Sequence, residues 1–206
     1  GAGALVAVLL IALPGSVPLS SEPLNGGVPG EILFNEEGDL ATVQVLKDPR
    51  RSVRRTMTID GTTIGWSTGF RGSLGYRKQI LLAHLPKVLD SRIRHVLNVG
   101  LGSAVTLQTL ASYPEIETLD CVEISAAVVR ACELFPESAV LADPRVSLIV
   151  DDALHYLQQS GPQYDLIVSD GKQDPLHAGN AIMLCREYYE YARERLTDDG
   201  LLVQWH

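Results

Sequence analysis

The spacing of apolar residues changes at about residue 71. From there on, short apolar runs alternate with segments whose apolar residues recur at helical spacing. The apolar runs predict strands over 95–100, 119–125, 146–152, 164–170 and 201–205. The segments between them predict helices over 103–113, 126–135, 153–160 and 187–196, and an earlier helix begins at Gly75 and ends near Pro86. Such alternation predicts an α/β fold, a Rossmann-like doubly wound parallel sheet with helices on both faces, over residues 71–206.

Before this domain, residues 31–70 show a different pattern. Two segments, 31–48 and 52–67, are rich in β-branched residues and contain turn formers at 37–39 and 60–61. They predict a small antiparallel β unit. The arginines between the segments favour a solvated hairpin end, with contact to anionic lipid headgroups as the alternative; they are Arg50, Arg51, Arg54 and Arg55.

The first thirteen residues carry no charge. As a helix at ~1.5 Å per residue they would span only about 20 Å, less than the roughly 30 Å of a bilayer core. We therefore expect 1–14 to be the end of a transmembrane helix, with a helix or strand buried against the domain as the alternative, and 15–30, rich in Pro, Gly and Ser, to be a linker. The sheet ends in a strand at residue 205, so we expect the fold to be truncated at both ends.

Composition excludes some partners. The net charge of −8 argues against a nucleic-acid partner, because phosphates favour basic surfaces. The three cysteines are widely spaced and the five histidines show no paired spacing, so we predict neither disulfides nor a metal site, and a reducing compartment.

In a parallel sheet of this kind, ligands bind at the carboxyl ends of the strands. The first strand ends in Gly100 and Gly102, and a helix opens at Ser103. Glycines allow a tight turn that approaches a ligand closely. A dinucleotide fingerprint would need a third glycine at Val105, so an NAD site is disfavoured.

Carboxylates follow the next three strands. Glu123 ends the second strand, about twenty residues downstream, where a carboxylate can accept both hydroxyls of a ribose. Asp151 and Asp152, before Ala153, end the third, where an acid can accept from an adenine amino group. Asp170 ends the fourth, where it can take a proton or hold an ammonium. Helix caps and a turn aspartate are the structural alternatives for these carboxylates.

In this order, the motifs resemble the spermidine synthase family, the polyamine aminopropyltransferases, and specifically the branch fused to membrane helices. The motifs are "IDG", "LGYRKQILLAHLP", "NVGLGSAVT", "CVEIS", "DDA", "YDLIVSD" and "LTDDGLLVQW", within residues 32–206. The resemblance implies transfer of an aminopropyl group from decarboxylated S-adenosylmethionine to an amine. It implies that Asp170 is the base, and that the donor is bound by Gly100, Gly102, Ser103, Glu123, Asp151, Asp152 and Ala153.

The acceptor side departs from the family pattern. Ser103 stands where the family has an aspartate, and Ala41 where it has a glutamine. Tyr76 and Asp174 are kept as substrate residues, but Arg77, Lys78 and Lys172 add positive charge nearby. We therefore expect an acceptor less cationic than putrescine, because a diamine requires carboxylates.

Two other functions remain open. One is a methyltransferase, which uses the same fold with S-adenosylmethionine itself as the donor. Lys172 or Arg77 could then bind the carboxylate of that donor. The other is a non-catalytic module of a membrane protein that senses a nucleotide or polyamine. We further expect a membrane-associated protein with this domain on the cytoplasmic face, and a homodimer as its assembly.

Overall fold

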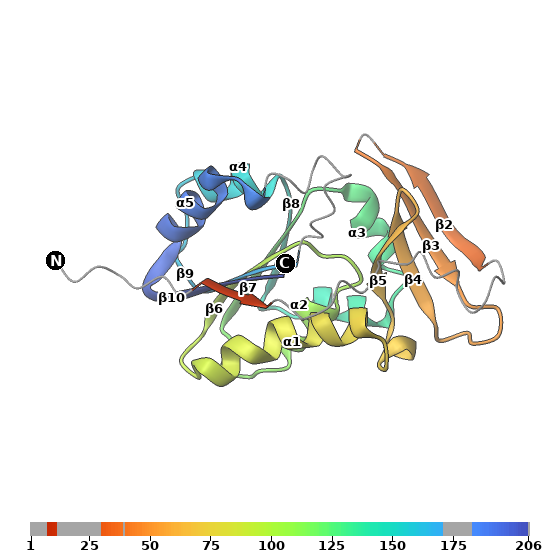
Figure 1. Cartoon of the computed structure of the whole chain (residues 1–206), viewed down its shortest axis with the longest axis horizontal. Helices are drawn as coiled ribbons and strands as arrows, with labels where there is room; N and C mark the ends of the chain where they lie inside the picture. Colours follow the sequence, from red (N-terminus) through yellow and green to blue (C-terminus); the bar gives the residue numbers. More distant parts are fainter. Residues whose placement is uncertain (1–7, 12–29, 39, 171–182, 206) are drawn as a thin grey trace.

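The computed structural model describes residues 8–11, 30–38, 40–170 and 183–205. Their strands form two sheets, a parallel sheet in the order β1-β10-β9-β6-β7-β8 and an antiparallel sheet in the order β2-β3-β4-β5 (Figure 1). The strands of the parallel sheet are β1 (Val8–Ile11), β6 (His95–Val99), β7 (Thr118–Glu123), β8 (Val146–Val150), β9 (Tyr164–Ser169) and β10 (Leu196–Trp205). The predicted α/β fold and the small β unit before it are confirmed.

Helices cover both faces of the parallel sheet. They are α1 (Leu74–Leu89), α2 (Val105–Ala111), α3 (Ala126–Cys132), α4 (Ala153–Gln158) and α5 (Arg186–Glu194), with short 3-10 helices η1 (Thr68–Phe70) and η2 (Pro136–Ala142). α1, α2 and α3 lie on one face of the sheet and α4 and α5 on the other (Figure 1). Side chains of the first three helices pack into one apolar core, and those of the other two into a second. The sheet is therefore the middle of three layers.

The expected end of the first helix near Pro86 is wrong. α1 continues to Leu89, and the Asp90 amide donates to the Pro86 carbonyl at 2.8 Å. Pro86 has no N–H and so removes one hydrogen bond from the helix, but it lies in the last turn, so the helix needs to continue only three residues beyond it.

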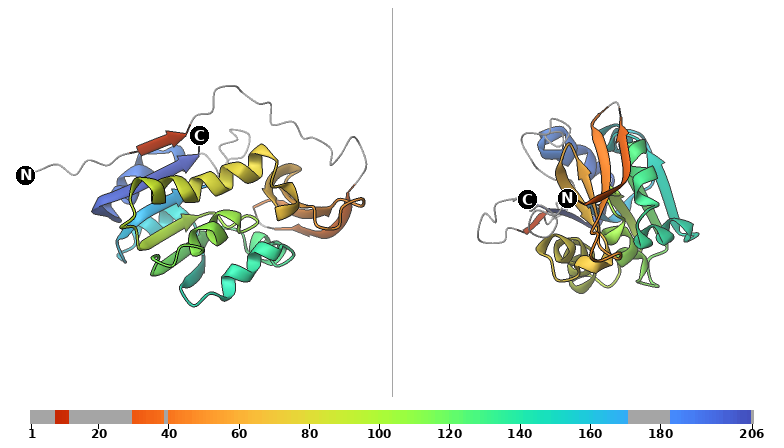
Figure 2. Two further views of the ribbon diagram at one scale, coloured as in Figure 1. Left: turned by 90° about the horizontal axis from the view of Figure 1, so that it is seen from below. Right: turned by 90° about the vertical axis from the view of Figure 1, so that its right-hand side faces the viewer.

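The antiparallel sheet is a four-stranded unit at one end of the molecule (Figure 2). Its strands are β2 (Glu31–Glu37), β3 (Thr42–Lys47), β4 (Arg55–Ile59) and β5 (Thr62–Trp66). Val43, Val45 and Met57 enter the same core as α3, because alternate residues of a strand share a face. Of the arginines between β3 and β4, Arg50 and Arg51 are exposed, as predicted for a solvated hairpin end.

The other two arginines bind main-chain carbonyls. Arg54 Nε donates to the Gly69 carbonyl at 3.1 Å, and Arg55 donates to the Leu134 carbonyl, just past α3. These contacts connect the β3–β4 region to η1 and to the larger domain.

Within the hydrophobic N-terminal segment, Val8–Ile11 form β1, which pairs in parallel with β10 along Leu202–Trp205. These four residues thus form a strand against the domain, which was the alternative to a transmembrane helix. They cover the edge of β10 that faces away from β9. The rest of the segment and the linker lie outside the described residues, and the boundaries 1–14 and 15–30 stay predictions. No helix in the described part of the chain is long and apolar enough to cross a membrane.

Candidate active site at the strand ends

The strand order creates a switch point between β6 and β9. These two strands are neighbours, and the chain continues from β6 to β7 on one side and from β9 to β10 on the other. The Asp170 amide, after β9, donates to the Val99 carbonyl at 3.2 Å, next to Gly100. Ligands of doubly wound sheets bind in the crevice that forms at such a point. Gly100 and Asp170, predicted separately, are brought together here.

The turn after β6 depends on its glycines. Gly100 has φ +90° and Gly102 φ +51°, conformations that side chains rarely adopt. A Cβ added to Gly100 would meet nothing within 4 Å. The turn is therefore bare on this side, as a close approach of ligand to main chain requires.

Glu123 supports this turn from the end of β7. It is 7% exposed, and its carboxylate accepts from the Leu101 amide at 2.9 Å and the Ser125 amide at 2.9 Å. Burial raises the pKa of Glu123, although the main-chain hydrogen bonds oppose that change. The cap of α3 is Ser125, not Glu123. Contact of this carboxylate with a ribose stays a prediction.

The two aspartates after β8, Asp151 and Asp152, make hydrogen bonds at the start of α4. Asp152 caps α4 by accepting from the Leu154 and His155 amides at 2.8 and 3.0 Å. Asp151 contacts His155 Nδ1 at 2.9 Å and accepts from the Asp152 amide at 2.8 Å. Ala153 is the first residue of α4. The capping alternative therefore holds for Asp152, and contact of these residues with an adenine stays a prediction.

The Ser103 side chain is directed into the protein. Its Oγ donates to the Trp66 carbonyl at 3.0 Å and accepts from the Trp66 amide at 3.1 Å, and the residue is fully buried. A Cβ on Gly65 would lie 2.9 Å from the Ser103 Cβ, so β5 approaches the turn closely. In this structure Ser103 joins the β unit to the glycine turn; its predicted contact with the donor is not tested.

Asp170 is paired with Lys78 of α1. Lys78 Nζ lies 2.7 Å from Asp170 Oδ1, and the two side chains are only 7% and 8% exposed. Thr106 Oγ1 lies 3.1 Å from Asp170 Oδ2 and 3.3 Å from the Gln79 carbonyl. Lys78 Nζ also lies 5.1 Å from the centre of the Trp205 ring, within cation–π range. The proposed base is thus already neutralised by an internal ammonium.

The other acceptor residues lie elsewhere. Tyr76 is buried, and its pKa is raised by burial and by the nearby charge of Glu137, while a hydrogen bond from Arg71 lowers it. Its hydroxyl therefore lies among Glu137 and Arg71. Arg77 is exposed. Lys172 and Asp174 lie outside the described residues.

Sequence reasoning placed Lys78 near the acceptor site, but it missed the pairing of Lys78 with Asp170 and the contacts of Thr106 and Trp205 with that pair. Thr106 and Trp205 carry no local signal, because each comes from a different element. Lys78 does carry one, since it stands four residues before Leu82 on the buried stripe of α1, where a charge needs a partner.

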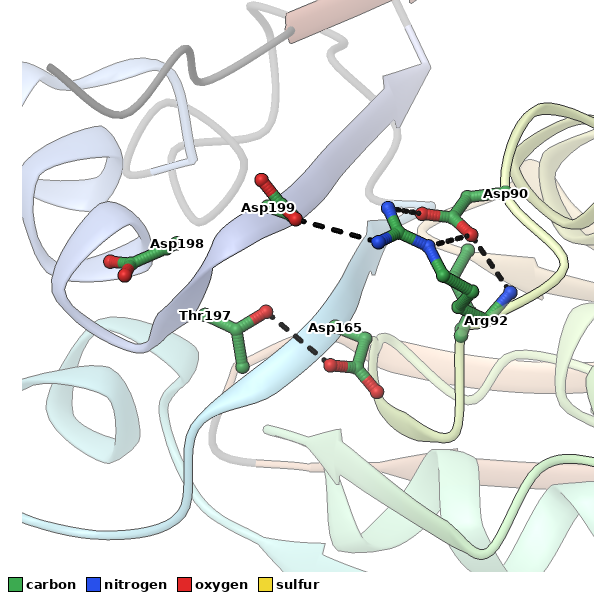
Figure 3. Close-up of a pocket in the computed structure, with 7 residues that line it drawn as sticks. Asp90, Arg92, Asp165, Thr197, Asp198 and Asp199 are labelled. Carbon is green, nitrogen blue, oxygen red and sulfur yellow. Dashed lines mark hydrogen bonds and ion pairs between the residues drawn. The ribbon is translucent and has the colours of Figure 1, made fainter. Parts of the chain in front are cut away.

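The opposite edge of the sheet holds a cavity of about 260 Å³. It lies at the amino ends of β6, β9 and β10 and is lined by Asp90, Arg92, Ile93, Asp165, Thr197, Asp198 and Asp199 (Figure 3). Arg92 pairs with Asp90 at 2.8 Å and Asp199 at 3.6 Å. Asp165 accepts from the Arg94 and His95 amides at 2.9 and 3.0 Å. These groups largely satisfy one another, so we place the candidate site at the switch point instead.

Comparison with known proteins agrees with the fold and the strand-end motifs. The spermine/spermidine synthase domain family matches residues 76–205. A polyamine aminopropyltransferase of Clostridium perfringens is 38% identical over 128 residues, which are 61% of this chain and 44% of the relative. Another of Clostridium botulinum is 30% identical over 176 residues, 84% of this chain and 59% of the relative. The chain thus spans about half the length of these relatives.

Solved structures show the same architecture. A spermidine synthase in complex with the transition-state analogue AdoDATO superposes with a TM-score of 0.72 at 20% identity, covering 83% of this chain and 56% of that one. The spermidine synthase from Thermotoga maritima gives 0.68 at 19% identity, covering 83% and 54%. At this identity the likeness is one of fold. The family match, which covers more than half of the chain, shows that the chain belongs to the spermine/spermidine synthase domain family.

Proposed function

We propose that this chain is a transferase domain that takes the aminopropyl group of decarboxylated S-adenosylmethionine and passes it to an amine acceptor less cationic than a free diamine. The single observation that carries the proposal is the switch point, where the main-chain amide of Asp170 donates to the Val99 carbonyl, next to the bare glycine turn. The family membership supports the reaction class.

The donor half is built from main chain. Positive φ angles at Gly100 and Gly102 leave room for the donor, and Glu123 fixes the turn through the Leu101 amide. We propose that the Glu123 carboxylate accepts the ribose hydroxyls, with Asp151, Asp152 and Ala153 beside the adenine. Nothing in this half needs a metal ion.

The reaction needs an uncharged amine in line with the donor. The nitrogen lone pair attacks the methylene carbon next to the sulfonium, the carbon–sulfur bond breaks, and its electron pair stays on sulfur as methylthioadenosine. The amine loses one proton, for which Asp170 is the proposed acceptor.

The acceptor half favours low charge. A diamine would bring two ammonium groups to an edge where Asp170 already holds Lys78 at 2.7 Å. Like charges at such distances repel, and burial strengthens the repulsion. An acceptor with one amine and no second ammonium avoids that repulsion.

Thermal unfolding with four ligands tests the proposal: S-adenosylmethionine, its decarboxylated form, methylthioadenosine and NAD. A ligand that binds only the folded state raises the midpoint. We expect a rise with the decarboxylated donor and methylthioadenosine that Glu123→Ala removes, and that Asp198→Asn, an exposed carboxylate at the opposite edge, leaves intact. A rise with S-adenosylmethionine alone would replace the proposal by a methyltransferase, and no rise with any ligand would refute it.

A second candidate is a non-catalytic module that binds the nucleotide. The buried Lys78–Asp170 pair favours it, because the Lys78 ammonium occupies the carboxylate that would have to take the proton of the amine. Methylthioadenosine binding without formation of methylthioadenosine from the decarboxylated donor, across a panel of monoamines, would identify the module.

We also propose that the protein is a membrane-fused member of the family with this domain on the cytoplasmic face. Its support is compositional, the uncharged run at residues 1–13, although Val8–Ile11 of this run form β1 in the structure. In cells, the protein should sediment with membranes and should be released when residues 1–14 are deleted. Sedimentation that the deletion leaves unchanged would refute this proposal.

A further inference from the structure

Lys78 is an unusual residue for its place. It lies on the face of α1 that also buries Leu82 and Pro86, and its side chain is 7% exposed. A lysine is almost never fully buried unless its charge is paired. Here Asp170, just after β9, pairs with Lys78, while Thr106 of α2 contacts Asp170 and Trp205 of β10 lies beside Lys78.

Stability alone is a weak reason for such a pair. Removing two charges from water costs about as much as their attraction returns, and apolar residues of similar volume often serve as well. The pair includes Asp170, which follows β9 at the switch point and whose main-chain amide donates to the Val99 carbonyl, next to Gly100. Its position therefore points to a task at the site.

The Lys78 ammonium has the chemistry of an acceptor amine. It is a primary alkylammonium on a flexible chain, held by a carboxylate and lying over an aromatic ring. One end of a free diamine would require the same carboxylate. The two ammonium groups cannot share it without like-charge repulsion.

We propose that Lys78 determines acceptor specificity by filling, with its own ammonium, the position on Asp170 that the amine of a free diamine would take. This inference rests on the proposed function, because it assumes that Asp170 faces the acceptor. It predicts that removing one side chain opens the position. Arg77, which is exposed, has no such effect.

Calorimetric titration with putrescine tests the inference on five forms of the whole chain: wild type, Lys78→Met, Lys78→Arg, Arg77→Met and the double variant Lys78→Met/Asp170→Asn. We expect the affinity for putrescine to rise at least tenfold in Lys78→Met. Lys78→Arg keeps the internal cation and should behave as wild type, as should Arg77→Met. The gain should disappear in Lys78→Met/Asp170→Asn, because the carboxylate is then gone. Lys78→Gln, which keeps a hydrogen-bond donor toward Asp170, replaces Lys78→Met if that variant does not fold.

Methylthioadenosine separates the two ways of failing. If Lys78→Met or Lys78→Gln binds methylthioadenosine but gains no affinity for putrescine, the inference is wrong and the proposed function stands. Wild-type protein that binds putrescine as tightly as these variants also overturns the inference. If wild type and variants bind neither methylthioadenosine nor the decarboxylated donor, the proposed function itself fails.

Discussion

Two buried carboxylates, Glu123 and Asp170, stand at carboxyl ends of the same sheet and are held in different ways. Glu123 accepts hydrogen bonds from main-chain amides, whereas Asp170 is paired with the side chain of Lys78, which comes from α1. Main-chain amides are present whatever the sequence, but a lysine can be replaced in one step. We infer that the donor side of the site, formed by the glycine turn and Glu123, follows from the fold. The acceptor side, formed by Asp170 and Lys78, can be changed by single substitutions.

The largest effect is expected when the Lys78–Asp170 pair is broken. Lys78→Met should lower the free energy of unfolding by about 3 kcal/mol, because it leaves a buried carboxylate without its counter-charge. Urea unfolding measures the change. Lys47→Met is the matched control, since Lys47 pairs with Glu31 at the surface and should lose less than about 1 kcal/mol. Equal losses in the two variants would mean that the buried pair contributes no more to stability than the surface pair does.

A smaller loss is expected at the other carboxylate. Glu123→Ala leaves the Leu101 and Ser125 amides without their acceptor, which should cost about 2 kcal/mol. Methylthioadenosine binding should be lost in Glu123→Ala and kept in Lys78→Met. Calorimetric titration of both variants checks this, and the reverse pattern would show that the two halves have been assigned the wrong way round.

The glycine turn should separate stability from binding. Gly100→Ala forces a side chain into φ +90°, at a cost of about 1 kcal/mol, with no clash in the protein. The added methyl group projects into open space, where the donor is proposed to lie. Methylthioadenosine affinity should therefore fall more than stability does, as titration and urea unfolding together would show. Unchanged affinity would place the donor elsewhere.

Glu137 extends the comparison to a third buried carboxylate, where we expect the smallest effect. One oxygen accepts from the Thr68 amide at 2.7 Å, while the other is buried without a hydrogen-bond partner. Burial raises the pKa of Glu137 above its usual 4.5. As pH rises from 4.5 toward the raised value, the unfolded chain releases this proton and the folded chain keeps it, so stability falls.

Glu137→Gln cannot titrate and should lack this loss. Urea unfolding between about pH 4 and pH 8 should therefore show wild type losing stability relative to Glu137→Gln as pH rises. Parallel curves for the two proteins would mean that the Glu137 pKa is not raised.

The periodicity of the chain was enough to predict strands β6 to β10, the helices between them and the strand ends that carry Gly100, Glu123 and Asp170, but it did not predict β1, which was expected to belong to a transmembrane helix. Local pattern determines these features, because buried strands and amphipathic helices differ in their spacing of apolar residues. The side-chain contacts at these positions could not be predicted in the same way. Ser103 binds the main chain of β5 because Gly65, which has no side chain, lets that strand approach the glycine turn closely. No residue next to Ser103 in the sequence indicates this contact. The pairing of Lys78 with Asp170 depends on how α1 packs against the sheet, a tertiary contact between distant segments.

The most direct test of the central claim is a double-mutant cycle on Lys78 and Asp170. The free energies of unfolding of wild type, Lys78→Met, Asp170→Asn and the double variant are measured under one set of conditions. We predict a coupling of about 2 kcal/mol or more, with the double variant close to wild type, because a neutral pair removes both buried charges together. A coupling below about 0.5 kcal/mol would show that the two side chains act independently, and would contradict an acceptor position filled by Lys78.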